Sequence, residues 1–160
     1  MLSIAGFLYY RSIILMDDIF DNKKETSNFN VFLTINICQE ETVKILSTFF
    51  ETDSEFWDIW GKRKFEYVKA YKLDKQSHNI SSFAEYEVLC DYKSSFGKIA
   101  IDALFVLTGK HYRNEYQNVL KSHKDFYVAF QILDDVSDYE EDYINQQFNM
   151  LENQPDPNLI

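Results

Sequence analysis

Helix-breaking residues are scarce in this chain of 160 residues, which contains only four glycines and two prolines. Glycine and proline are the strongest signals for the end of regular structure, so a chain with so few of them favours long helices. Apolar residues recur at helical spacing, and no segment alternates with the period of two that is typical of strands. The sequence therefore predicts a single all-α domain, a bundle of about five or six helices.

Capping signals and apolar spacing predict where the helices lie. Thr52-Asp53-Ser54 offers an N-cap for one helix, and Ser82 forms a capping-box pattern with Glu85 at the start of another. Gly109 stands where a C-cap glycine is expected. The expected helices cover residues 3–22, 31–50, 55–75, 82–108, a short segment 112–120, and a long segment that Ser122 caps and that runs to about residue 147. Residues 22–30 and 78–81 are expected to be connections, and 150–160 an irregular tail.

The charge balance excludes some classes of function. With 16 basic and 26 acidic residues the chain carries a net charge of -10, which argues against non-specific nucleic-acid binding. Residues 2–16 are apolar, but the run is too short to span a bilayer and lacks the features of a signal peptide. We therefore expect a buried helix at residues 2–16 and no membrane span.

Cysteines and histidines offer no metal or disulfide framework. Cys38 and Cys90 are the only cysteines, so we expect a reducing, cytoplasmic compartment. The three histidines lack the spacing of a ligand set, so we expect each of them at the surface. They are His78, His111 and His123.

Two aspartate-rich patterns lie far apart in the chain. A helix stacks residues four apart on one face, and stacked carboxylates repel one another, so a bound divalent cation would explain the pattern. Both patterns follow apolar runs, where the desolvation of a carboxylate must be compensated. Magnesium prefers such oxygen ligands. The aspartates are Asp17, Asp18 and Asp21 in the first pattern, and Asp134, Asp135, Asp138 and Asp142 in the second.

Two alternative kinds of metal site fit the acidic patterns less well. An EF-hand needs a glycine at its sharp turn, and none lies near Asp134. A di-iron bundle needs Glu-x-x-His pairs, which the sequence lacks. A pair of solvated acidic faces remains the plain alternative to ligand binding.

The motifs resemble those of a known superfamily. Asp17-Asp18-x-x-Asp21 resembles the first aspartate-rich motif of class I isoprenoid synthases. Phe130-Gln131-x-x-Asp134-Asp135-x-x-Asp138-x-x-x-Asp142 resembles the second motif of trans-prenyltransferases, the polyprenyl diphosphate synthases. Tyr92-Lys93-Ser94-Ser95 is similar to the Lys-Thr element on the preceding helix. The resemblance covers most of this chain but only the central helices of a complete synthase.

Some positions depart from the pattern of the family. Lys23 and Lys24 follow the first motif, where the elongating enzymes have two arginines, and Gly61-Lys62 stands for the Gly-Gln element. The basic residues that hold isopentenyl diphosphate in the family would precede residue 1. The chain therefore resembles the middle of a larger helical domain.

The resemblance implies magnesium-dependent ionisation of an allylic prenyl diphosphate, followed by prenyl transfer. Three Mg²⁺ ions would bridge the two motifs and the diphosphate, and Lys93 would add positive charge. The implied metal ligands are Asp17, Asp18, Asp21, Asp134, Asp138 and Asp142. The implied catalytic residues are Lys93, Asp134 and Asp135. The implied substrate-binding residues are Lys93, Gln131, Phe130, Ile13 and Tyr9.

Three of these residues have equally good structural interpretations. Ile13 and Tyr9 lie one and two turns below Asp17 on the same helix face, where they would line a prenyl tail or simply fill a core. Phe130 is either core or pocket wall. Gln131 lies one turn before Asp135 and is expected to hydrogen-bond the carboxylates.

Two other functions remain open. A terpene cyclase would use the same metal site, and a non-catalytic helical fragment of such an enzyme would need none of this chemistry. Isopentenyl diphosphate as a second substrate, and a homodimer, are open as well.

Overall fold

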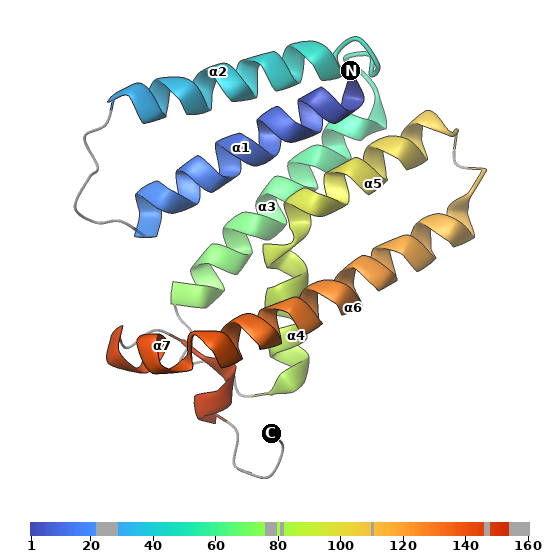
Figure 1. Ribbon diagram of the computed structural model, residues 1–160. Coiled ribbons are helices and arrows are strands. Elements are labelled where there is room, and N and C mark those ends of the chain that lie inside the picture. Colours follow the sequence, from blue (N-terminus) through green and yellow to red (C-terminus); the bar gives the residue numbers. More distant parts are fainter. Residues whose placement is uncertain (22–28, 76–79, 81, 110, 146–147, 154–160) are drawn as a thin grey trace. The chain divides into compact units, whose positions relative to one another are not determined.

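The computed structural model describes residues 1–21, 29–75, 80, 82–109, 111–145 and 148–153 (Figure 1). All regular elements in these residues are helices, so the all-α prediction is confirmed for the part described. They divide between two compact units, Met1–Trp57 and Asp58–Ile160. The elements are α1 (Leu2–Asp21), α2 (Phe29–Leu46), α3 (Glu55–Lys75), α4 (Phe83–Lys93), α5 (Ser95–Leu107), α6 (Arg113–Ser137), α7 (Tyr139–Asn145) and the 3-10 helix η2 (Met150–Asn153).

The first unit is built on α1 and α2, which lie alongside each other in opposite directions (Figure 1). Ala5, Tyr9 and Ile13 recur every four residues on α1, and all three are buried. The hydroxyl of Thr42 on α2 donates to the carbonyl of Ala5 (3.3 Å) and to that of Cys38 (2.7 Å). This buried polar bridge ties the two helices together.

The second unit has a core that joins α4 to α6 and η2. Tyr86, Leu89 and Cys90 of α4 are buried in one cluster with Val128 of α6 and Met150 of η2. The same cluster includes Ala70 and Ile80. Because this core packs against α6 near its C-terminal end, it helps to fix the position of the acidic motif there.

Three capping predictions are confirmed. The Ser54 hydroxyl accepts from the backbone N–H of Phe56 (3.3 Å) at the start of α3. Ser82 accepts from the backbone N–H of Glu85 (3.3 Å) at the start of α4. Gly109 follows α5 with a φ of 65°, in the left-handed region that glycine adopts without strain.

The predicted single helix over residues 82–108 is wrong, because the chain breaks at Ser94 into α4 and α5. The Ser94 hydroxyl donates to the carbonyl of Asp91 (2.9 Å). A serine that bonds a backbone carbonyl in this way competes with the helical ladder. The break therefore comes directly after Lys93, the last residue of α4.

The predictions after Gly109 are also wrong in detail. The short helix at 112–120 and the N-cap at Ser122 do not exist, because α6 runs unbroken from Arg113 to Ser137. It contains no glycine or proline that would end it.

The predicted bounds of the second helix are also shifted. In the first unit, α2 begins at Phe29 and ends at Leu46 rather than covering 31–50.

The connections at 22–30 and 78–81 lie mostly outside the described residues, although residues 29 and 30 already belong to α2. The tail expected at 150–160 begins with η2, a short helix, and residues 154–160 lie outside the described residues.

Candidate functional site

The second aspartate-rich motif lies at the C-terminal end of α6, where Asp135 is buried. Its Oδ2 accepts from the Tyr86 hydroxyl (2.8 Å) and from the backbone N–H of Met150 (3.2 Å). Burial raises the pKa of Asp135, although these two donors and the charge of Lys93 oppose the rise. These bonds connect the end of α6 to α4 and η2. The catalytic role expected of Asp135 stays a prediction.

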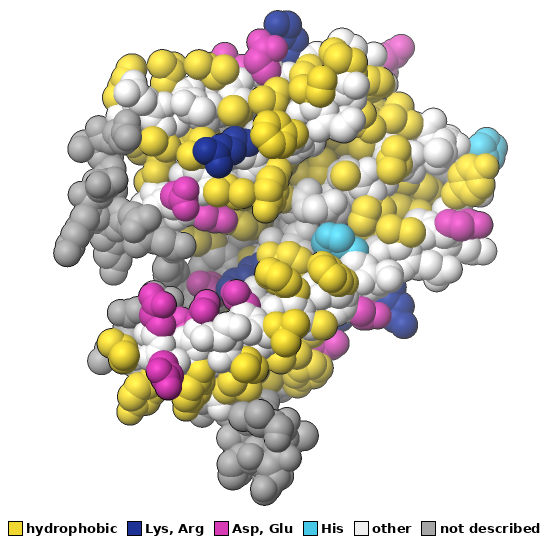
Figure 2. All heavy atoms as spheres, viewed as in Figure 1, with side chains coloured by type: hydrophobic (Ala, Val, Ile, Leu, Met, Phe, Trp, Pro, Cys, Tyr) yellow, Lys and Arg dark blue, Asp and Glu magenta, His cyan; other side chains and the backbone are white. Residues whose placement is uncertain are grey.

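The neighbouring aspartates face solvent. Asp134 and Asp138 are exposed, and Figure 2 shows acidic side chains gathered over α7 and the adjoining end of α6. The side-chain amide of Gln131 donates to Oδ2 of Asp134 (3.1 Å). The expected hydrogen bond from Gln131 to a carboxylate of the motif is confirmed, and one oxygen of Asp134 remains free of that bond.

The three aspartates spaced four apart do not lie on one continuous helix. The predicted helix to residue 147 is wrong, because α6 ends at Ser137 and α7 begins at Tyr139. Backbone bonds from Asp138 N to Asp134 O (2.9 Å) and from Asp142 N to Asp138 O (2.8 Å) persist across the junction. The chain therefore bends at Asp138, while hydrogen bonds between residues four apart continue from Asp134 to Asp142.

Asn149 contacts both sides of this bend. It is fully buried, and its Nδ2 donates to the backbone carbonyl of Asp135 (2.6 Å) and to Oδ2 of Asp142 (2.9 Å). The last four carbonyls of a helix have no partner within the helix, and Asn149 supplies one. Nothing in the sequence motif marks this residue, because it lies seven positions beyond the last aspartate.

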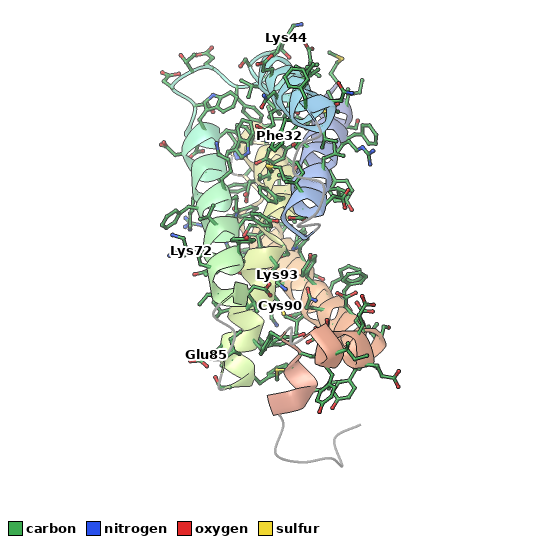
Figure 3. The ribbon with its side chains drawn as sticks, turned by 90° about the vertical axis from the view of Figure 1, so that its left-hand side faces the viewer. Phe32, Lys44, Lys72, Glu85, Cys90 and Lys93 are labelled. Atoms are coloured by element: carbon green, nitrogen blue, oxygen red, sulfur yellow. The ribbon has the colours of Figure 1, made fainter. Side chains whose placement is uncertain are left out.

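Lys93 ends α4, one turn after Cys90 (Figure 3). Its ammonium pairs with the carboxylate of Asp74 at 2.8 Å, and its side chain is 29% exposed. Burial alone would lower the pKa of Lys93, but the charges of Asp74 and Asp135 raise it above the ordinary value. Lys93 is therefore a charged group on the unit that carries the second motif.

The first motif ends α1. Asp17 is half-buried, Asp18 is exposed, and the side chain of Asp21 lies outside the described residues. Below them Tyr9 and Ile13 are buried, which suits a core position and does not test a pocket. The site shared by the two motifs stays a prediction.

Phe130 is half-exposed on α6 rather than buried. Its ring lies 6.5 Å from that of Phe126 and 6.0 Å from that of Tyr127, measured between centroids. The core alternative for Phe130 is therefore wrong for the described residues, and its contact with a substrate stays a prediction.

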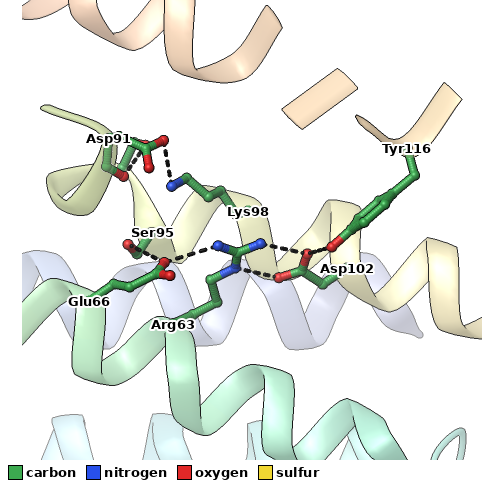
Figure 4. Close-up of polar contacts among 8 residues, drawn as sticks. Arg63, Glu66, Asp91, Ser95, Lys98, Asp102 and Tyr116 are labelled. Carbon is green, nitrogen blue, oxygen red and sulfur yellow. Dashed lines mark hydrogen bonds and ion pairs between the residues drawn. The ribbon is translucent and has the colours of Figure 1, made fainter. Parts of the chain in front are cut away.

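A second polar cluster, which the sequence analysis missed, joins α3, α5 and α6 (Figure 4). Arg63 donates to Oδ2 and Oδ1 of Asp102 (2.7 and 3.0 Å) and to Oε2 of Glu66 (2.9 Å). Tyr116 donates to Oδ1 of Asp102 (2.7 Å), and Ser95 to Oε2 of Glu66 (3.2 Å). Burial and the bond to Asp102 raise the pKa of Tyr116 to about 12. Among the described residues, no buried side-chain nitrogen or oxygen of this cluster lacks a hydrogen-bond partner, which favours a structural role.

The signal that would have found this cluster is Asp102 itself. It stands in an otherwise apolar stretch of α5 and is completely buried. A buried carboxylate requires a paired cation, and α3 supplies Arg63. One turn before Asp102, the buried Lys98 pairs with Asp91 at 2.6 Å.

One histidine is less exposed than a surface position predicts. His123 is half-buried, and its Nδ1 has no hydrogen-bond partner among the described residues. Burial, followed by the charge of Lys98, lowers the pKa of His123. His111 is exposed as expected, and His78 lies outside the described residues.

Both cysteines are free and buried, as expected of a chain without a disulfide framework. Burial raises the pKa of Cys90 to about 11. A thiol with so high a pKa is almost entirely protonated at neutral pH, so Cys90 is a poor nucleophile.

The donor chemistry at the end of α6 fits magnesium. In the part of the chain that the structure describes, no three His, Cys, Asp or Glu side chains come together as a ready-made metal cluster. Magnesium does not need one, because it commonly takes one or two carboxylates, several waters and the phosphate oxygens of a substrate. Exposed Asp134 and Asp138 meet that requirement.

The described helices include none that is long and apolar enough to cross a membrane. Comparisons with family models, curated proteins and solved structures gave no match.

Proposed function

We propose that this chain binds the diphosphate of an allylic prenyl substrate through magnesium and promotes its ionisation, as class I isoprenoid synthases do. The observation that carries the proposal is that the aspartates of the second motif differ in burial and in hydrogen bonding. Asp135 is buried and held by two donors, whereas Asp134 and Asp138 expose their carboxylates on the same turn and the next. A motif that served only solubility would not need a buried aspartate that accepts two hydrogen bonds, as Asp135 does.

The residues of the chain have separate parts in this proposal. Asp135 holds the end of α6 in place, Gln131 orients Asp134, and Lys93 contributes positive charge toward a bound diphosphate. Bound magnesium would neutralise charge on the leaving diphosphate as a Lewis acid. By the resemblance to that superfamily, Asp17 and Asp18 of the first motif would be the further ligands of the metal.

The direct test is a melting experiment with magnesium chloride and sodium diphosphate, added separately and together. A ligand that binds only the folded chain raises its melting temperature by mass action. We expect a rise with the two together that Asp134→Ala and Asp18→Ala remove. Asp125→Ala is the matched control, because Asp125 is an exposed aspartate of α6 outside the motif. No rise in the unaltered chain, or a rise that Asp134→Ala retains, contradicts the proposal.

Product analysis separates the prenyltransferase from the cyclase. Geranyl or farnesyl diphosphate is incubated with and without isopentenyl diphosphate. We expect a longer prenyl diphosphate that appears only with isopentenyl diphosphate. A hydrocarbon or alcohol formed without it would assign a cyclase, and no product with intact diphosphate binding would assign a non-catalytic helical fragment.

A further inference from the structure

The junction between α6 and α7 is held by one side chain from outside both helices. Asn149 is buried without exposure, and both ends of its amide are used. Its Nδ2 donates to Asp135 O (2.6 Å) and Asp142 Oδ2 (2.9 Å), while its Oδ1 accepts from the backbone N–H of Leu151 (3.1 Å). No shorter or purely apolar side chain can make all three bonds.

The bond to Asp142 distinguishes Asn149 from an ordinary helix cap. A cap needs only the carbonyl of Asp135, yet the same nitrogen also holds one carboxylate oxygen of the last aspartate in the motif. The bond from Asn149 takes one carboxylate oxygen of Asp142, Oδ2, and a cation would be bound through the other, Oδ1. This is how second-layer donors orient carboxylates that bind metals.

A parallel arrangement occurs at the other end of the motif. Gln131 donates its amide N–H to Oδ2 of Asp134 (3.1 Å). Both outer aspartates of the motif therefore receive one neutral amide donor, whereas Asp135 between them is held by Tyr86 and Met150. Amide donors orient a carboxylate without neutralising its charge, which keeps the carboxylate attractive to a cation.

We propose that Asn149 is a positioning residue for magnesium and diphosphate binding, which acts by fixing Asp142 and the bend between α6 and α7. This inference rests on the proposed function. Loss of a donor to a metal-binding carboxylate weakens metal affinity by about 10- to 100-fold. Asn149→Ala should therefore weaken the binding of magnesium diphosphate by at least about tenfold.

The experiment measures two quantities for each variant. Titration calorimetry with magnesium chloride and inorganic diphosphate gives the binding constant, and the melting temperature in EDTA gives the metal-independent stability. Tyr116→Phe is the matched control, because it also removes a donor to a carboxylate, that of Asp102, away from the motif. We expect Tyr116→Phe to lower the melting temperature and leave binding unchanged. Asn149→Ala should lower both.

The outcomes separate this inference from the proposed function. No binding by the unaltered chain overturns both. Normal binding by Asn149→Ala, with a lower melting temperature in EDTA, overturns only the inference and leaves Asn149 as a helix cap. Should Asn149→Ala fail to fold, Asn149→Asp keeps the volume but replaces the donor by a carboxylate facing Asp142. The same two measurements then apply, with unchanged affinity again the contradicting result.

Discussion

Arg63 donates hydrogen bonds to both carboxylate oxygens of Asp102, from Nε to Oδ2 at 2.7 Å and from Nη2 to Oδ1 at 3.0 Å. The two residues lie on α3 and α5, 39 positions apart, and the Asp102 side chain has no exposed surface. Bidentate pairs of this kind fix direction as well as distance. This pair therefore sets how α5 lies against α3 in the second unit.

Asp102→Ala should be one of the most destabilising single changes in the chain. Removing one partner of a buried ion pair leaves the other charge uncompensated and costs about 3–5 kcal/mol. Glu66 remains beside Arg63 and should hold the loss toward the lower end of that range. Urea unfolding measures it. Lys44→Ala is the control, because its pair with Glu41 is exposed and contributes at most about 1 kcal/mol. Equal shifts for the two variants would contradict the structural role.

Gly97→Ala should destabilise the chain, although alanine normally favours a helix by about 1 kcal/mol over glycine. A Cβ at position 97 would lie 2.6 Å from Nε2 of His123, which is closer than any real contact. The sign of the effect is the test. In a His123→Ala background the clash is gone, and Gly97→Ala should become stabilising. If Gly97→Ala already stabilises the unaltered chain in thermal melts, the imidazole moves aside freely and the prediction is wrong.

The stability of the second unit should fall in mild acid through His123. Burial and the charges of Lys98 and Arg63 lower its pKa in the folded chain, against Asp91 and Asp102, which raise it. Because the unfolded histidine titrates near 6.5, the unfolded chain binds more protons below that pH, and stability falls as pH falls.

Urea unfolding between pH 7.5 and 5.5 checks this dependence on pH. His123→Gln should lose less stability over the range than the unaltered chain does, because the variant has no proton to bind at that position. His111→Gln, at an exposed position, is the control and should follow the unaltered chain. Parallel curves for His123→Gln and the unaltered chain would rule out the effect.

Lys93→Met and Asp74→Asn should change diphosphate binding in opposite directions, if the proposed function holds. Lys93 pairs with Asp74 at 2.8 Å, so the loss of Asp74 frees the ammonium for the ligand. Each effect should be only a few-fold, since partly exposed pairs contribute up to about 1 kcal/mol. Calorimetry with magnesium diphosphate measures both. Weaker binding in Asp74→Asn would show that the pair positions Lys93 rather than competing for it.

Local signals predicted the helices well where a cap or a breaker was present. The start of α4 at Ser82 and the glycine after α5 follow from hydrogen bonding and backbone sterics within a few residues. The break at Ser94 was missed because serine is tolerated inside helices, and only its bond to the Asp91 carbonyl reveals the break. The interruption after Ser137 was missed for a related reason, since Asn149, which holds it, lies twelve residues further on.

The candidate site was predicted only as far as the motif extends. Spacing identified Asp134 and Asp138 as candidate ligands, and the expected hydrogen bond from Gln131 to a carboxylate of the motif is confirmed. The anchoring of Asp135 by Tyr86 was not predictable, because the two lie 49 positions apart and no local pattern joins them. Long-range polar pairs of this kind depend on tertiary packing, which a motif does not encode.

Tyr9 and Ile13 supply the last prediction, which concerns chain length and rests on the proposed function. Both are buried on the face of α1 that leads from Asp17. One helical turn rises about 5.4 Å, close to the length of one isoprene unit. Tyr9→Ala should therefore allow a prenyl diphosphate about one unit longer to bind or form, and Ile13→Phe should shorten it. As a core change alone, Tyr9→Ala would cost about 3 kcal/mol of stability without any change in length preference.

The preferred prenyl chain length of each variant is measured with a series of prenyl diphosphates, together with its melting temperature. Phe7→Ala, at an exposed position of α1, is the control. Unchanged length preference in both variants, with lower stability, would assign the two residues to the core.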